Sequence, residues 1–234
     1  MVSNGQGVSS PGFWEGLSGQ NPAGLINNQR VKIQLGAATF DNSTANARGS
    51  AALLAGNGSV AGGIEYSKYN SAPYPQGSAQ INGGLALHAS SVHTTFGFSG
   101  HQYQPNGGSS FDAGILTEIA PMIRFGAIVP DFTHGLHIVA GGFTFNLDPA
   151  VDLVVDAAYH LNARNGTVKP GMTLHTDLVQ ATAAYGIKFT GTSDVFLSSK
   201  FTGALGLKVS DNFLVEYEYR ALPEHRLGLT LRLN

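Results

Sequence analysis

The sequence predicts an all-β protein, a transmembrane antiparallel β-barrel of about 12 strands (roughly 10 to 14). Three observations lead to this prediction. Apolar and polar residues alternate in segment after segment, only 12% of the residues are charged although 42% are hydrophobic, and 31 of the 234 residues are glycine. Alternation with a period of two is typical of strands whose two faces meet different surroundings. A soluble surface carries more charge than this, so the composition favours an outer surface that faces lipid.

The alternation is clearest in the closing hairpin, residues 205–234. Its apolar positions are Phe213, Val215, Tyr217, Tyr219, Leu227, Leu229, Leu231 and Leu233, and they alternate with Leu214, Glu216, Glu218, Arg220, Arg226, Gly228, Thr230 and Arg232. In a soluble sandwich the apolar face would point inward, whereas in a membrane barrel it points to lipid. One hairpin does not decide between them. The repetition of the pattern, the low charge and an even strand count favour the barrel.

The same pattern predicts strands at about 30–40, 59–67, 81–88, 92–101, 111–119, 122–129, 134–145, 151–162, 174–190, 195–209, 213–220 and 226–234. Residues 1–29 are predicted to be an irregular N-terminal segment, and residues 30–234 the barrel. Residues 41–58 and 163–171 are expected to be loops because they are small and polar. An even count places the 210–212 turn on the periplasmic side, the 221–224 connection outside, and the tight 147–150 turn outside as well.

Several classes of protein are not supported by the sequence. There is no cysteine, so disulfides and thiolate metal sites are excluded. A net charge of −2 and a pI near 6.4 argue against a nucleic-acid partner. The chain lacks the glycine-rich and Gly-x-Ser-x-Gly motifs of common enzymes, and we expect no cofactor and no catalytic residues. The first residues lack the pattern of a signal peptide, so we expect the mature form of an exported protein.

Two groups of polar residues are predicted to face the lumen. The first is a charge network of Arg30, Lys32, Glu216, Glu218, Arg220, Arg226 and Arg232, which barrel closure would bring together. It could be a structural network of paired charges or a selectivity element. The second is a ladder of Asp152, Asp156 and His160 on one strand. Its members are about 13 Å apart, which favours solvation of the lumen over a shared metal.

A family resemblance enters at Gln20-Asn21-Pro22-Ala23-Gly24-Leu25, which is followed by the first strand. This run resembles the start of FadL-type outer-membrane transporters of hydrocarbons and fatty acids, which are longer and have more strands. The resemblance implies an N-terminal hatch inside the barrel, and here Phe13, Trp14, Asn21 and Pro22 would form this plug. The aromatic pair Phe13 and Trp14 could equally rest at the membrane interface. The end of the chain, Arg226-x-Gly228-x-x-Leu231-x-Leu233, looks like a barrel-assembly signal.

The resemblance implies passive passage of small, fatty-acid-like hydrophobic molecules across a bacterial outer membrane, with membrane lipid and a small hydrophobic ligand as partners. One alternative is a narrow porin for small polar solutes, which would use the lumen charges. Another is a closed structural or interaction barrel, with residues 41–58 and 163–173 as contact surfaces. An acyl-modifying barrel enzyme has the least support.

Overall fold

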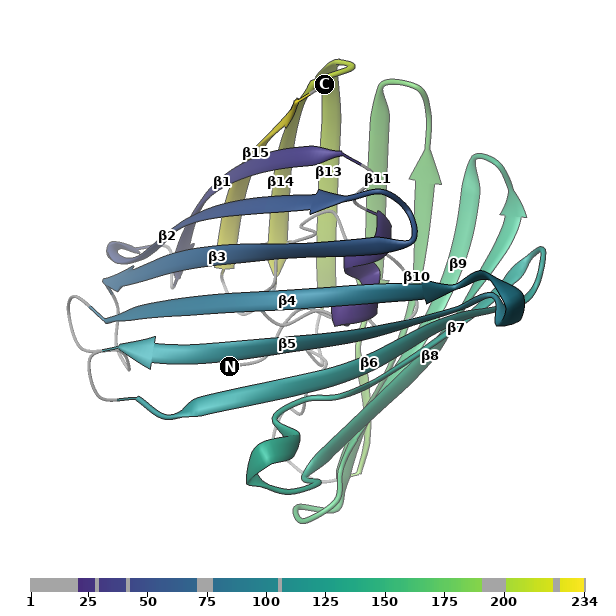
Figure 1. Cartoon of the computed structure of the whole chain (residues 1–234), viewed down its shortest axis with the longest axis horizontal. Helices are drawn as coiled ribbons and strands as arrows, with labels where there is room; N and C mark the ends of the chain where they lie inside the picture. The colour runs from purple at the N-terminus through teal and green to yellow at the C-terminus, as the bar shows by residue number, and fades with distance from the viewer. Residues whose placement is uncertain are drawn as a thin grey trace.

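The structure is a computed structural model that describes residues 21–27, 30–40, 43–70, 78–104, 107–190, 201–220 and 224–233. These residues form a closed antiparallel barrel (Figure 1). Its strands are β1 (Val31–Phe40), β2 (Ser43–Gly56), β3 (Val60–Asn70), β4 (Ala79–Ala89), β5 (Thr94–Gln104), β6 (Ser109–Ala120), β7 (Ile123–Val129), β8 (Ile138–Asp148), β9 (Val151–His160), β10 (Asn165–His175), β11 (Val179–Tyr185), β12 (Ile187–Thr190), β13 (Phe201–Ser210), β14 (Phe213–Arg220) and β15 (Glu224–Leu233). The 3-10 helices are η1 (Pro22–Asn27), η2 (Ser90–Val92) and η3 (Phe132–His134). No helix in the described ranges is long and apolar enough to cross a membrane.

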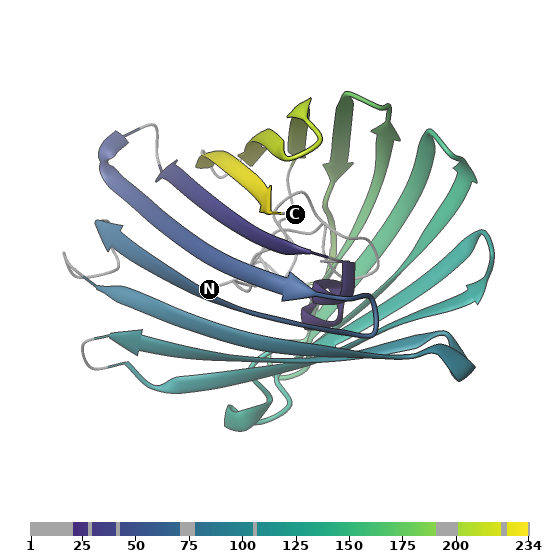
Figure 2. The same ribbon diagram turned by 45° about the horizontal axis from the view of Figure 1, so that its top comes forward.

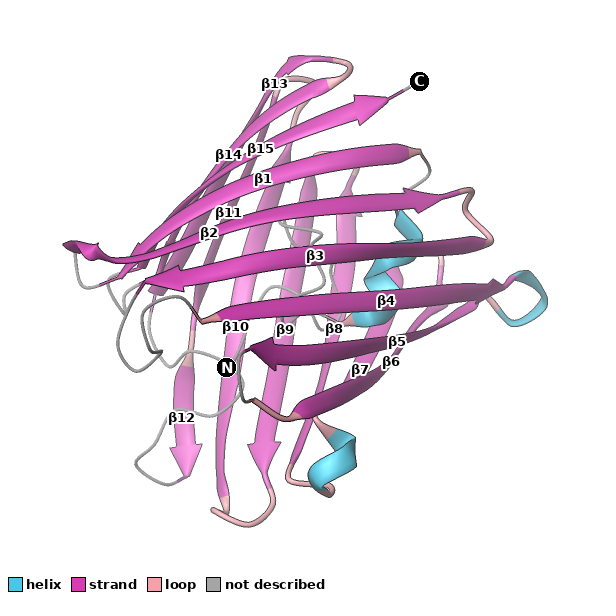
Figure 3. Cartoon of the chain, turned by 60° about the vertical axis from the view of Figure 1, so that its left-hand side comes forward, coloured by secondary structure: helices cyan, strands magenta, loops and turns pink. Residues whose placement is uncertain are grey.

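The ring has 14 strands rather than the predicted 12 or so. Neighbouring strands pair in chain order, β1 pairs with β15, and β10 pairs with β11. Among the described residues, the short strand β12 pairs only with β10 and lies outside this ring of hydrogen bonds (Figure 3). It nevertheless continues the register of β11, since Gly171 pairs with Ala184 and Thr167 with Lys188. We therefore describe β11 and β12 as two segments of one strand that is interrupted at Gly186.

The two additional strands lie where loops were predicted, and both loop predictions are wrong. Strand β2 covers most of 41–58, and β10 covers most of 163–171. In β2 the outward positions include Gly49, Ala51 and Ala55, which are too small to give a visible apolar stripe. With these segments inside the barrel wall, the contact surfaces proposed for 41–58 and 163–173 are not loops.

In β10 the misleading residue is Pro170, which has no backbone N–H and is usually found outside central strands. Its pairing with β9 is continuous, with Pro170 opposite Val155. On the other side, the pairing stops at Gly171 and resumes at Val168, where β11 gives way to β12. The barrel therefore accommodates the proline by interrupting the neighbouring strand.

The extra strands also move the 149–150 turn to the opposite end of the barrel from the one predicted. We call the end at which β1 begins and β15 ends the proximal rim. It carries the turns 57–59, 90–93, 121–122, 149–150, 176–178 and 211–212. The opposite, distal rim carries the longer 130–137 connection and the 161–164 turn. The 149–150 turn thus shares a rim with the 211–212 turn, so the prediction that placed these two turns on opposite sides of the membrane is wrong.

The burial of the strand side chains distinguishes the outer face of the barrel wall from the inner face. Exposed residues along the strands are mostly large and apolar, as with Leu205 at 50% and Phe98 at 57%. Polar residues such as Glu216, Glu218 and Thr230 are buried between them and point into the ring. This is the reverse of a soluble protein and matches a wall with lipid outside and a polar interior.

This orientation predicts how an added charge affects stability. Leu205→Arg puts a guanidinium at mid-strand on the lipid face, and we expect it to lower the unfolding free energy by about 2–4 kcal/mol. Val209→Arg, next to the proximal rim on the same strand, should cost about 0–1 kcal/mol. Urea unfolding of the barrel in lipid vesicles measures both, and equal costs would contradict the assigned outer face.

Candidate functional site

The short helix η1 lies against the inner face of the barrel (Figure 2). It packs on β3, β4, β5 and β6, where Gly97 provides the closest approach. The outward neighbours Phe96 and Phe98 show that Gly97 points inward. A Cβ atom built at Gly97 would be 2.1 Å from the backbone nitrogen of Ala23. Only glycine therefore leaves room for the helix at this point of the wall.

The side chain of Asn21 ties the start of η1 to the barrel. Its Nδ2 donates hydrogen bonds to the carbonyl oxygens of Ile115 on β6 (2.9 Å) and Ala127 on β7 (3.2 Å). Its Oδ1 accepts a hydrogen bond from the backbone N–H of Ala23 (3.1 Å). A Cβ atom at Gly114 would be 2.1 Å from that Oδ1. The Asn-Pro-Ala run is thus docked through its own amide in a niche lined by glycine.

The remainder of η1 is held by apolar contacts. Leu25 is buried in a cluster with Leu54, Ala61 and Ala86, and Ile26 packs against the same cluster. These partners come from β2, β3 and β4. The helix therefore has a polar attachment at Asn21 and an apolar attachment at Leu25, on neighbouring parts of the wall.

Toward the distal rim, polar side chains form a hydrogen-bonded belt across β2, β3 and β4. Arg48 forms a buried ion pair with Glu65 at 2.9 Å and donates a hydrogen bond to Ser67 at 2.9 Å. The Arg48 guanidinium also lies over the ring of Tyr69, 5.3 Å from its centroid. The Tyr69 hydroxyl donates to Gln80 Oε1 at 2.7 Å. The charges on this part of the wall are therefore paired and held in place.

The belt continues across β5 and β6. Gln80 donates to Asn82 at 2.7 Å, and His101 lies 2.8 Å from Asn82 Oδ1 and 2.8 Å from Asp112 Oδ2. The other oxygen of Asp112 accepts the backbone N–H of Asp131 at 2.8 Å. The belt thereby anchors the 130–137 connection at the distal rim to the inner wall.

The residues of the predicted charge network occupy several positions. Glu218 and Arg226 face each other on β14 and β15, with 3.7 Å between Oε2 and Nη1. Glu216 is buried beside them and accepts a hydrogen bond from Thr230. Lys32 is buried directly opposite Arg232 in the β1 and β15 register. Arg30 is exposed and lies at the proximal rim, just before the first strand.

Three predicted residues fall outside the part whose side chains the structure describes: Phe13, Trp14 and Arg220. Pro22, in contrast, is buried within η1.

The predicted ladder does not form one site. Asp152 lies 2.8 Å from His175 on β10. Asp156 is fully buried and directly opposite Lys169, as expected of a favourable cross-strand pair. His160 accepts the backbone N–H of Ala163 in the following turn. Within the described ranges, no group of three potential ligands is arranged to hold a metal ion.

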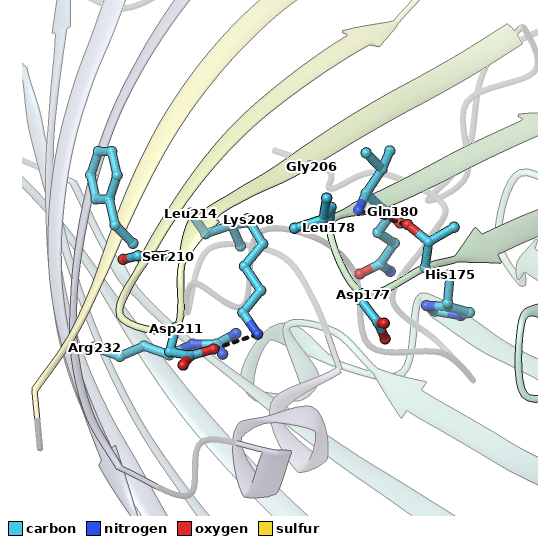
Figure 4. Close-up of a pocket in the computed structure, with 13 residues that line it drawn as sticks. His175, Asp177, Leu178, Gln180, Gly206, Lys208, Ser210, Asp211, Leu214 and Arg232 are labelled. Atoms are coloured by element: carbon cyan, nitrogen blue, oxygen red, sulfur yellow. Dashed lines mark hydrogen bonds and ion pairs between the residues drawn. The ribbon is translucent and has the colours of Figure 1, made fainter.

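A pocket of about 140 Å³ opens on the inner side of the proximal rim (Figure 4). It lies between the 176–178 and 211–212 turns, and its charged lining includes Lys208, Asp211 and Arg232. Lys208 forms an ion pair of 2.7 Å with Asp211. The Lys208 hydrogen bond and charge, followed by the charges of Arg232 and Arg30, lower the pKa of the exposed Asp211 carboxyl.

The fold and the inner wall define a closed β-barrel of the membrane type, with an apolar outer face and a polar interior. The fold is similar to that of the toluene transporter TbuX of Ralstonia pickettii, with a TM-score of 0.68, 9% identity, and coverage of 100% of this chain and 97% of that one. A mutant porin of Rhodopseudomonas blastica is also similar, with a TM-score of 0.51, 9% identity, and coverage of 87% and 99%. No protein-family model and no curated protein sequence matches. The resemblance to FadL-type barrels is thus confirmed at the level of the fold.

The niche at Gly97 predicts a specific effect on η1. Gly97→Ala places a methyl group where the backbone of Ala23 lies, so η1 must leave the wall. We expect hydrogen exchange at residues 21–27 to become much faster, because their docking protects them. Gly83→Ala, also on the barrel wall, meets only the carbonyl oxygen of Gly63 at 4.0 Å and serves as the control. Unchanged exchange in Gly97→Ala would show that η1 does not dock there.

The polar belt predicts a second effect. Glu65→Leu leaves the buried Arg48 guanidinium without its carboxylate. We expect a loss of about 3–5 kcal/mol in unfolding free energy, because an uncompensated buried charge is costly. The double variant Arg48→Met/Glu65→Leu should recover much of it in urea unfolding in vesicles. Equal stability of the single and double variants would contradict a buried pair.

Proposed function

We propose that this barrel provides passive passage for small hydrophobic molecules across a bacterial outer membrane, with the N-terminal segment as a hatch. The observation that carries the proposal is the docking of Asn21 to η1 and to two strands of the inner wall. A short segment docked on the wall can leave it without unfolding the barrel.

The inner wall next to Asn21 is apolar, which favours a hydrophobic substrate. Gly114 on β6 contacts Asn21 and lies opposite Ile128 on β7. The same row of the wall continues with Ala140 on β8 and Ala158 on β9. These three apolar residues are buried on the inner wall and form a cluster with Ile138. Displacement of the hatch would extend this apolar strip toward Leu54 and Ala86. The similarity to a toluene transporter is consistent with such a cargo.

A narrow porin for polar solutes is the second candidate. The polar belt on β2 to β6 favours it, and so does the similarity to a porin. The pairing of the belt charges argues for a structural role of these residues, since Arg48 and Glu65 neutralise each other.

Replacement of Asn21 tests the hatch. Asn21→Ala removes the hydrogen bonds to the carbonyl oxygens of Ile115 and Ala127, worth about 1 kcal/mol each, so we expect the undocked state to become about 30-fold more populated. Uptake of a fluorescent fatty acid into liposomes should rise accordingly, and deletion of residues 1–29 should raise it further. Asn27→Ala, at the exposed end of the same helix, is the matched control.

Each outcome separates the two candidates. Uptake that is unchanged by both Asn21→Ala and the deletion would overturn the hatch. Uptake no faster than in empty liposomes, together with discrete ion conductance in planar bilayers, would replace the hydrophobic passage with the porin.

A further inference from the structure

The pocket at the proximal rim combines cationic and apolar groups on its lining. Lys208 and Arg232 both point inward, since they alternate with the exposed Leu207, Val209, Leu231 and Leu233. They come from different strands, β13 and β15, and Lys208 forms an ion pair with Asp211 at the edge of the pocket (Figure 4). Leu178 and the inward-facing Leu214 complete the lining near these charges.

The surroundings of the two cations favour an anion, because the carboxylate next to Lys208, that of Asp211, is loosely held. Asp211 bonds Lys208 but is 92% exposed on its side chain, so water competes for it and it can swing away. The low pKa of its carboxyl reflects the positive surroundings supplied by Lys208, Arg232 and Arg30. In addition, the Nε atom of Arg232 is buried and has no hydrogen-bond partner among the described residues. The other acidic group of the lining, Asp177, lies on the turn across the pocket (Figure 4).

The volume and the apolar side chains limit the rest of the ligand. A cavity of about 150 Å³ holds one benzene molecule, and this pocket measures about 140 Å³. An inorganic anion would leave Leu178 and Leu214 without a partner, whereas an apolar body the size of one ring would cover them.

We propose that this pocket binds a small organic carboxylate with an apolar body of about the size of one aromatic ring. Lys208 and Arg232 bind the carboxylate, which takes the place of Asp211 beside Lys208. The apolar body rests against Leu178 and Leu214. This site is separate from η1 and the hatch, and it binds whether or not the barrel transports hydrophobic molecules.

Calorimetric titration of the whole barrel in detergent with benzoate tests the site. We expect saturable binding of benzoate at low ionic strength that weakens with added salt, because charge pairs at an exposed rim are screened. Benzamide, which has the same shape and no charge, and inorganic phosphate should each bind at least about tenfold more weakly. Lys208→Met/Arg232→Met should lose benzoate binding, whereas Lys68→Met, an exposed lysine near the distal rim, should retain it.

A second variant keeps the proposal testable if the double variant does not fold. Asp211→Asn removes the carboxylate that competes for the two cations, so benzoate should bind several-fold more tightly. Equal affinity for benzoate and benzamide, or weaker benzoate binding by Asp211→Asn, would overturn the proposal. Unchanged benzoate binding in a folded Lys208→Met/Arg232→Met variant would overturn it as well.

Discussion

The pairing of β1 with β15 is the contact on which the whole structure depends. Within a membrane no water is available for backbone N–H and C=O groups, so a sheet can cross only if it closes on itself. The register from Val31 opposite Leu233 to Phe40 opposite Glu224 joins the first strand to the last. Without it, two strand edges would face lipid with unpaired backbone groups. The inner wall, the docked helix and the rim pocket all require this closure.

Closure also explains the distribution of charge. Once the outside is apolar, the few charged residues of the strands are left mainly to the inner wall, where they need partners. Arg48 with Glu65 and His101 with Asp112 meet this need through side chains from adjacent strands. The helix η1 fits the same wall only where the polar side chains give way to Gly97 and Gly114. The interior is thus divided into a paired polar belt and a glycine-lined niche.

Much of this architecture could be predicted from alternation alone. The fold class, the apolar exterior and the inward Glu216, Glu218 and Arg226 follow from a period of two. Strands β2 and β10 could not be recognised, because β2 has small outward residues and β10 contains Pro170, so neither gives a clear alternating signal. Missing two strands kept the count even but moved the 149–150 turn to the wrong rim.

The site was predicted less completely than the fold. The Asn-Pro-Ala run drew attention to Asn21, but its partners Ile115 and Ala127 are backbone carbonyls, which leave no signal in a sequence. Glu65 and His101 fall on polar faces in the alternation, whereas their pairing with Arg48 and Asp112 depends on the strand register. The inward position of Arg48 could not be predicted at all, because this residue lies in the segment that was predicted to be a loop.

The central claim is that a closed wall with lipid outside encloses a polar interior, and adjacent residues of one strand test it most directly. A fluorescent label placed in turn at Ala204 and Leu205 of β13 can be exposed to lipids with brominated chains. The structure predicts strong quenching at Leu205, which is half exposed, and little at Ala204, which is buried on the inner face. Equal quenching at both positions, or stronger quenching at Ala204, would contradict it.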